Sequence, residues 1–148
     1  MYDINIIAKY IYDLNLSNMT HKKLQKLCYY LQAWHLAVSG SRIIDSDFRA
    51  WVHGSINMEL WGKCRNGFDN LKGIDTDIIT NDDKIFIGKI INLYGKNTGD
   101  ELEQLVCSEL PWIIARRGSD YWEATQNLIS NNLMKSYYKN LLKRKEIR

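Results

Sequence analysis

Histidine and cysteine are the residues in this chain of 148 that are best suited to chemistry, because they bind metal ions and act as bases or nucleophiles. His21, Cys28 and His35 follow one another at intervals of seven residues, so they share one face of a helix. Seven residues rise about 10.5 Å along a helix, which is too far for two of these side chains to bind one ion. The sequence contains neither a His-x-x-x-His nor a Cys-x-x-Cys pair. We therefore expect no metal site, with Cys28 a buried apolar residue and His35 an ordinary helix residue.

Other catalytic arrangements are missing from the sequence as well. None of Cys28, Cys64 and Cys107 is placed by the sequence near a base or in a sharp strand-to-helix turn. Gly95-x-x-x-Gly99 is followed by Asp100, where a phosphate-binding loop has lysine and then serine or threonine. We therefore expect no catalytic residues, no cofactor and no enzymatic activity.

Two short segments are candidates for contact with another protein. In Trp51-x-His53-Gly54, a glycine after aromatic residues indicates a sharp turn with positive φ, which either positions a loop for a partner or closes the core. In the second segment, charged residues flank Pro111-Trp112. Charged residues beside an exposed tryptophan would form a binding hot spot, whereas a proline and a tryptophan that lock a turn would be purely structural. The candidate partner-binding residues, expected at or near exposed positions, are Trp51, His53, Gly54, Glu109, Trp112 and Arg116.

The elements that must hold these segments are predicted from apolar spacing and helix caps. A short amphipathic helix spans about 4–14. A longer one spans about 20–39, with Thr20 as its N-cap and Gly40 as its stop. Apolar residues line two sides of this longer helix, so it is expected at the centre of the core, with its polar side at Lys22, Lys23 and Lys26.

The remainder of the chain predicts further helices and little else. Thr80 and Thr98 each begin a capped helix, Pro111 lies in the first turn of a short one, and Ser130 caps the last. Residues 42–44 are the candidate extended stretch, and 66–79 are expected to form an irregular loop. We therefore predict a mainly α fold, a compact single-domain bundle of six to seven helices over 1–148 with at most a minor β element.

Charge and composition limit the classes of function. Lysine and arginine total 20 against 17 acidic residues, and residues 135–148 alone carry six basic residues and one acid. This basic end is either a solvated helix face or a weak contact for nucleic acid or a partner. With no signal peptide, no apolar run long enough for a membrane span and no cysteine framework, we expect a soluble cytoplasmic protein.

Several segments, in order, resemble one known family. Residues 24–34, LQKLCYYLQAW, are similar to the "LQKLLYYAQ" helix of the Panacea antitoxin domain, whose members include phage-associated GepA-like proteins. Residues 48–54 resemble its "F-x-A-W-x-x-G-P-V", and 93–105 its "YG…L…L". Residues 108–116 resemble its "T/S-x-E-x-P-W-x-x-A-R", and 129–138 its closing "I…YY". One departure is Gly54-Ser55-Ile56, where the family has Gly-Pro-Val.

The resemblance implies a mainly helical domain that neutralises a cognate toxin by direct protein–protein contact, with no catalytic residues to carry over. Loop 66–79 and the basic end are the expected partner-specific parts. A nucleic-acid-binding regulator that contacts DNA through residues 135–148 is the main alternative, and it predicts binding that weakens steeply with salt. A small hydrolase with His53 or Glu109 as its base is the third. The sequence leaves self-association open.

Overall fold

The computed structural model describes residues 1–145, and of Lys145 only the backbone. Within this range the chain forms seven α-helices, one short 3-10 helix and a two-stranded sheet. The α-helices are α1 (Ile4–Tyr12), α2 (His21–Ser39), α3 (Met58–Cys64), α4 (Asn81–Tyr94), α5 (Gly99–Cys107), α6 (Leu110–Ala115) and α7 (Asn131–Lys145). The strands are β1 (Arg49–Trp51) and β2 (Gly54–Ile56), and the 3-10 helix is η1 (Asp69–Leu71). The prediction of a mainly α fold with a minor β element is confirmed.

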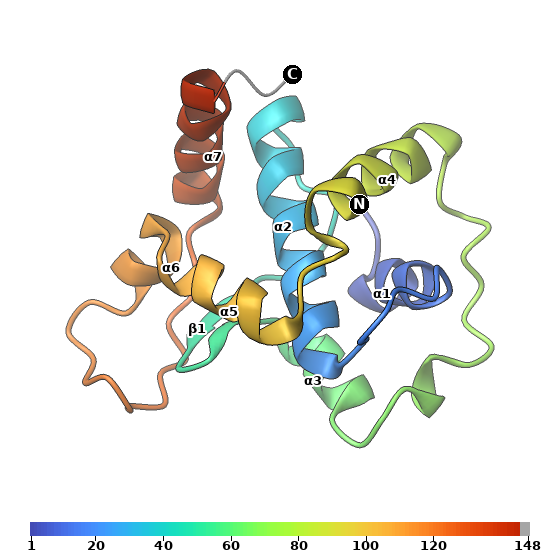
Figure 1. The fold of residues 1–148 in the computed structure, drawn as a ribbon, viewed down its shortest axis with the longest axis horizontal. Coiled ribbons are helices and arrows are strands. Elements are labelled where there is room, and N and C mark those ends of the chain that lie inside the picture. Colours follow the sequence, from blue (N-terminus) through green and yellow to red (C-terminus); the bar gives the residue numbers. More distant parts are fainter. Residues whose placement is uncertain (146–148) are drawn as a thin grey trace.

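Helix α2 is the central element of the core. It runs through the middle of the molecule with α7 on one side and α4 and α1 on the other (Figure 1). Every residue from Lys23 to Trp34 is buried. A helix that is buried on all sides must be surrounded by other elements, as the two apolar stripes of residues 20–39 predicted.

Two of the three lysines expected on the polar side of α2, Lys23 and Lys26, are buried, so the prediction is wrong for these two. The Nζ of Lys23 donates to the main-chain oxygens of Ser17 at 2.9 Å and Gly95 at 2.7 Å. The Nζ of Lys26 donates to the main-chain oxygen of Ser55 at 3.3 Å. The long apolar stem of lysine lies within the core, and its ammonium group reaches carbonyl groups that would otherwise lack a donor.

The helix ends follow the sequence closely. Thr20, Thr80 and Thr98 each accept a hydrogen bond from a main-chain N–H in the first turn of their helices. Thr98 and Glu101 form a full capping box. Gly40 ends α2 in the left-handed conformation, with φ of 80°.

The extended elements differ from the prediction. The strands pair as an antiparallel hairpin in which Trp51 is opposite Gly54, leaving a loop of Val52 and His53. The expected stretch at 42–44 makes only one isolated bridge, between Ile44 and Tyr2. Residues 127–129 lie along the free edge of β1, where Ala50 donates to the main-chain oxygen of Asn127 at 2.9 Å. Both edges of β1 are therefore paired, which covers one of the two outer edges of this short sheet.

Two connecting segments complete the fold. The loop predicted at 66–79 contains η1, and it is anchored by the buried side chains of Leu71 and Ile79. Residues 116–130 form a long connection from α6 to α7 beside the hairpin (Figure 1). Of the predicted basic end at 135–148, residues 146–148 lie outside the described part of the chain.

Candidate protein-binding surface

Glu109, one of the predicted partner-binding residues, is a buried anchor and not a surface group. Its side chain is only 6% exposed. Its Oε1 accepts hydrogen bonds from the hydroxyls of Tyr30 at 2.6 Å and Tyr138 at 2.8 Å. Burial has the largest effect on Tyr30 and raises the pKa of its phenol, and the charge of the Glu109 carboxylate raises that pKa further. The phenol therefore stays protonated and acts as the donor. Glu109 thereby joins the start of α6 to both α2 and α7.

Trp112 and Arg116 attach α6 to the hairpin. The Nε1 of Trp112 donates to the main-chain oxygen of Trp51 at 2.8 Å. The Nη1 of Arg116 donates to the main-chain oxygen of Ala50 at 2.9 Å, and its guanidinium lies 5.4 Å from the centre of the Trp112 ring. Arg116 is 7% exposed, so it too is a buried structural group. One bond comes from Trp112 within α6 and the other from Arg116 directly after its last residue, and together they fix the helix along β1.

Arg116 also shapes the connection that follows α6. Its Nη2 donates to three main-chain oxygens, those of Asp120 at 3.0 Å, Tyr121 at 3.2 Å and Glu123 at 2.9 Å. A planar guanidinium offers several donors in fixed directions, which suits it to hold several carbonyls at once. The turn that contains Tyr121 and Trp122 is therefore held against the hairpin by one side chain.

Gly54 has a conformational role that only glycine fulfils. Its φ is 106°, in the region that other residues rarely adopt. A Cβ atom at this position would lie 2.9 Å from the Cε of Lys26, which packs beneath the hairpin. The predicted sharp turn after the aromatic residues is confirmed, and it brings the hairpin close to α2.

The exposed part of this region is aromatic. Tyr121 and Trp122 are each 73% exposed, and their rings pack edge to face with centroids 4.6 Å apart. Trp122 lines a cavity of about 250 Å³ together with Trp51 and His53. Trp51 in turn packs edge to face on Trp61 of α3, at 5.9 Å between ring centroids. We call these five side chains, Trp51, His53, Trp61, Tyr121 and Trp122, the aromatic surface.

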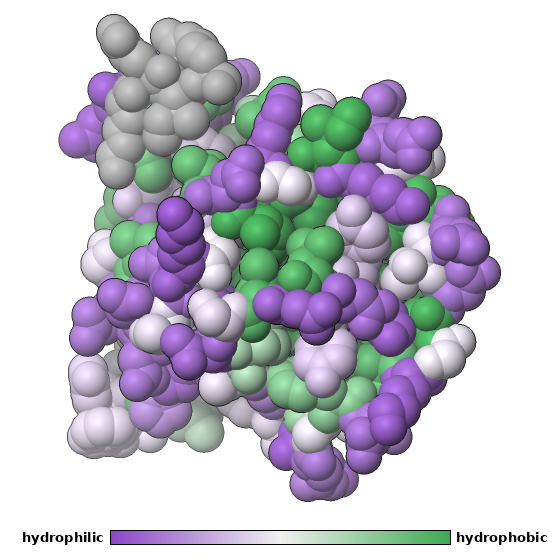
Figure 2. Space-filling view, turned by 45° about the vertical axis from the view of Figure 1, so that its right-hand side comes forward, coloured by the Kyte–Doolittle hydropathy of each residue, from purple (hydrophilic) through white to green (hydrophobic). Residues whose placement is uncertain are grey.

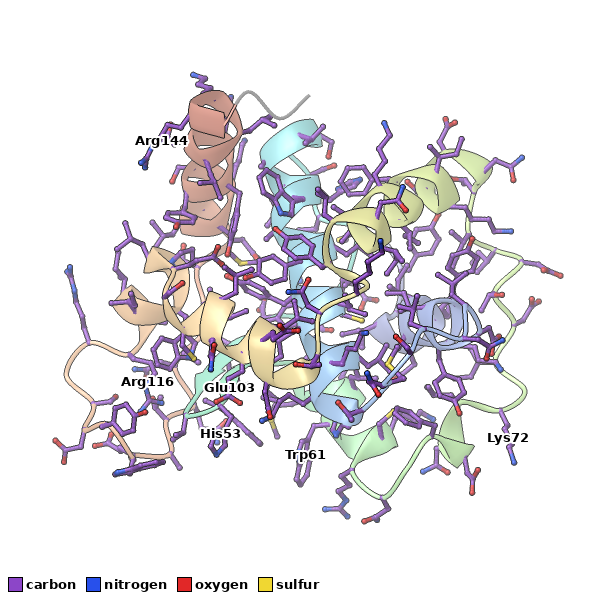
Figure 3. All side chains as sticks on the ribbon, in the orientation of Figure 1. His53, Trp61, Lys72, Glu103, Arg116 and Arg144 are labelled. Carbon is purple, nitrogen blue, oxygen red and sulfur yellow. The ribbon has the colours of Figure 1, made fainter. Side chains whose placement is uncertain are left out.

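A charged network borders the aromatic surface at the hairpin loop. His53 lies beside Glu103 of α5, with its Nδ1 3.3 Å from the Glu103 Oε2 (Figure 3). Lys22 of α2 is 2.7 Å from the other oxygen of Glu103 and 2.9 Å from Asp100. Partial burial opposes ionisation of Glu103, but the hydrogen bonds from Lys22 and His53 outweigh it and lower the pKa of that carboxyl. The network therefore ties the hairpin loop to α2 and α5.

The structure brings the predicted residues into one region but gives them different positions. Trp51 and His53 belong to the aromatic surface, whereas the buried Glu109 and Arg116 lie behind it. Gly54 and the part-buried Trp112 hold the hairpin in place. Glu109 and Arg116 are themselves buried, so the exposed residues expected in this region lie near them and not at these two positions.

Three aromatic residues of this surface were not predicted. These are Trp61, Tyr121 and Trp122. The last two are adjacent aromatics within a polar stretch that follows Gly118 and lacks helical spacing. Large apolar side chains that no periodic pattern places in the core are the signal that would have identified them.

Several kinds of site are not found in the described part of the chain. No group of three or more His, Cys, Asp or Glu side chains among residues 1–145 is placed to hold a metal ion. No helix described here is both long enough and apolar enough to cross a membrane.

Comparison with known proteins agrees with the motifs. The family described as "Antitoxin SocA-like, Panacea domain" matches residues 24–113, which run from α2 into α6. No curated protein and no solved structure matches the chain. The matched range covers more than half of the sequence, and it contains the central helix, the hairpin and the Glu109–Trp112 anchor. The chain belongs to the Panacea domain family of SocA-like antitoxins.

Proposed function

We propose that this protein neutralises a cognate toxin by direct contact through the aromatic surface, and that it acts in the cytoplasm as a binding protein without catalysis. The observation that carries the proposal is the pair Tyr121 and Trp122, each 73% exposed beside the cavity at Trp51 and His53. Leaving two large aromatic side chains in water forgoes favourable burial. Burial against a partner would recover it.

The way in which the aromatic side chains are held supports the same proposal. Aromatic residues are enriched among the few that carry most of the energy of a protein interface. Arg116 fixes the main chain at Tyr121 in advance through the carbonyls of residues 120, 121 and 123. A loop that is already ordered loses less conformational entropy on binding. Glu109, Trp112 and Arg116 would thus serve recognition by positioning, without touching the toxin themselves.

The position of the surface relative to the family match supports partner-specific recognition. Trp51, His53 and Trp61 lie inside the matched range 24–113, whereas Tyr121 and Trp122 follow it. A standard interface buries about 800 Å² on each partner, with some 20–30 residues a side. The aromatic surface would supply the centre of such an interface, and neighbouring polar residues its rim.

The test is co-expression with the product of the adjacent gene. If that product arrests growth, the wild-type protein is expected to restore growth and to co-purify with it. The double variant Tyr121→Ala with Trp122→Ala is expected to lose both rescue and co-purification. Its own fold should be unchanged, because both side chains are exposed; circular dichroism and a thermal melt check this.

Ile78→Ala is the matched control. Ile78 is also an exposed large apolar residue, but it lies in the segment between η1 and α4, on the opposite side of the molecule from loop 116–130 (Figure 1). Ile78→Ala should rescue growth as well as the wild type does. A folded Tyr121→Ala, Trp122→Ala variant that still rescues would overturn the role of the aromatic surface. A harmless neighbour that does not co-purify would overturn the antitoxin proposal itself.

A further inference from the structure

A second surface lies on another side of the molecule, where α2, α4 and α7 meet. It is an open cavity of about 370 Å³. Its walls are Trp34 and Val38 of α2, Phe86, Ile90 and Leu93 of α4, and Leu142 of α7. We call it the α2–α4–α7 groove. Its volume is within the range of about 300–1,000 Å³ typical of ligand-binding clefts.

The groove has a buried apolar floor and exposed apolar edges. Trp34 and Ile90 are each 4% exposed, whereas Val38 is 60% and Leu93 50% exposed. The indole N–H of Trp34 already donates to the hydroxyl of Tyr94 at 2.7 Å, so it seeks no acceptor from an occupant. The interior therefore favours apolar side chains. The space-filling view shows apolar side chains over the region of α4, bordered by hydrophilic ones (Figure 2).

Apart from the first turn of α4, the charged side chains on the three helices that form this groove are basic within the described residues. Neither α2 (His21–Ser39) nor α7 (Asn131–Lys145) contains an acidic residue, and α4 has none after its first turn. Lys89 of α4 lines the groove directly. Helix α7 also carries lysines at 135, 139 and 143, and the Lys135 ammonium is close to the end of α2, 3.5 Å from where a Cβ atom added at Gly40 would lie. An occupant with an apolar side for the floor and a negative side for the rim would complement both features.

We propose that the α2–α4–α7 groove docks an amphipathic helix with an acidic polar face, supplied by a partner protein. Grooves formed between helices commonly receive the apolar stripe of such a helix, at positions i, i+3, i+4 and i+7. Glutamate or aspartate on its polar face would then face Lys89 and the lysines of α7. The groove is formed by residues other than those of the aromatic surface, so this inference does not rest on the proposed toxin contact.

The experiment uses the full-length protein and two designed peptides. Each peptide is a helix of about 15 residues, roughly 22 Å long, with leucine at i, i+3, i+4 and i+7. One carries glutamate and the other lysine at the remaining exposed positions. Fluorescence anisotropy is expected to show at least about tenfold tighter binding of the glutamate peptide. That preference should shrink as salt is raised, because exposed charges are screened.

Two variants with matched controls locate the binding. Leu93→Asp introduces a negative charge on the apolar edge of the groove. It is expected to raise the dissociation constant of the glutamate peptide at least about tenfold. Lys89→Glu is expected to raise the dissociation constant of the glutamate peptide at least about threefold and to lower that of the lysine peptide. The controls are Ile78→Asp and Lys72→Glu, both exposed residues in the segment before α4 that do not line the groove. Figure 3 shows Lys72 at the lower right, well below α4. They should change neither dissociation constant by more than about twofold.

Three results would overturn the inference. One is equal binding of the two peptides, and another is no binding of either at millimolar concentration. The third is binding of the glutamate peptide that Leu93→Asp leaves unchanged in a folded protein. Phosphatidylserine vesicles and duplex DNA are measured in parallel. If either binds in a manner sensitive to Leu93→Asp while the glutamate peptide does not, the groove serves a membrane or a nucleic acid instead.

Discussion

Arg116 donates a hydrogen bond of 2.9 Å to the main-chain oxygen of Ala50, 66 residues earlier in the chain. The same guanidinium holds the carbonyls of Asp120, Tyr121 and Glu123. One buried side chain therefore links the hairpin to the loop that presents Tyr121 and Trp122. Order in the proposed recognition loop depends on a residue that is itself inaccessible to a partner.

Arg116→Lys is expected to release this loop. Lysine keeps the charge but cannot direct donors to four carbonyls, and each lost bond from a charged donor is worth about 1.5–3 kcal/mol. We expect a loss of about 2–4 kcal/mol in the free energy of unfolding. Hydrogen exchange of the amides in residues 119–126 should become faster. Arg117→Lys, at the exposed neighbouring position, is the control. Unchanged exchange in Arg116→Lys would contradict the role given to Arg116.

Tyr30 and Tyr138 should be energetically coupled through Glu109. Both hydroxyls donate to the same carboxylate oxygen. Removing one hydroxyl leaves the other donor in place, whereas removing both takes both tyrosine donors from a buried carboxylate. Tyr30→Phe and Tyr138→Phe are each expected to cost about 1–3 kcal/mol, and the double variant more than their sum by at least about 0.5 kcal/mol. Urea unfolding of the four proteins measures this cycle, and strict additivity would argue against a shared carboxylate.

The buried side chain of Lys26 is expected to make the free energy of unfolding depend on pH. Burial lowers its pKa from 10.5 to about 8, although the charge of Glu103 opposes the shift. Between these values the unfolded chain binds a proton that the folded protein has released, so the stability contributed by Lys26 rises with pH. Below pH 8 the folded protein retains a charged lysine in the core, at a cost on the order of 3 kcal/mol.

Lys26→Met isolates this contribution. The free energy of unfolding of the wild type, minus that of the variant, is expected to rise by about 2–3 kcal/mol between pH 7 and pH 10. Tyrosines and cysteines also titrate in this range, but they are present in both proteins and largely cancel in the difference. Chemical unfolding at a series of pH values gives the curve. A difference that stays constant from pH 7 to pH 10 would show that Lys26 is charged throughout.

Ser55→Pro restores the residue of the family pattern, and the hairpin is expected to accept it. Ala50, opposite Ser55, directs its N–H outward to Asn127, which identifies the pair as one without mutual hydrogen bonds. The Ser55 N–H therefore also points away from β1, and proline removes no bond of the ladder. The Ser55 hydroxyl is buried without a partner among the described residues. We expect unchanged or higher stability, by up to about 1 kcal/mol. A thermal melt checks this, with Ser55→Ala as the control for loss of the hydroxyl, and a large decrease confined to Ser55→Pro would contradict the assigned pairing.

Most of the helices and their ends could be predicted from the order of residues alone. Thr20, Thr98 and Gly40 act on N–H and C=O groups within a few residues, and apolar spacing along α2 marks its faces locally. The helix motif of residues 24–34 and the motif around Glu109 and Trp112 were together sufficient to indicate the family. These features depend on neighbours in the chain, so the order of residues specifies them directly.

Which residues are exposed, in contrast, depends on how distant segments pack together. Lys23, Lys26, Glu109 and Arg116 are charged, and charged residues are mostly found at the surface. Each is buried here because its hydrogen-bond partners include groups brought together from distant parts of the chain. Trp122 is exposed for the converse reason, since Arg116 holds its loop outside the core. Spacing along a helix reports contacts within one or two turns, whereas burial depends on contacts across the whole fold.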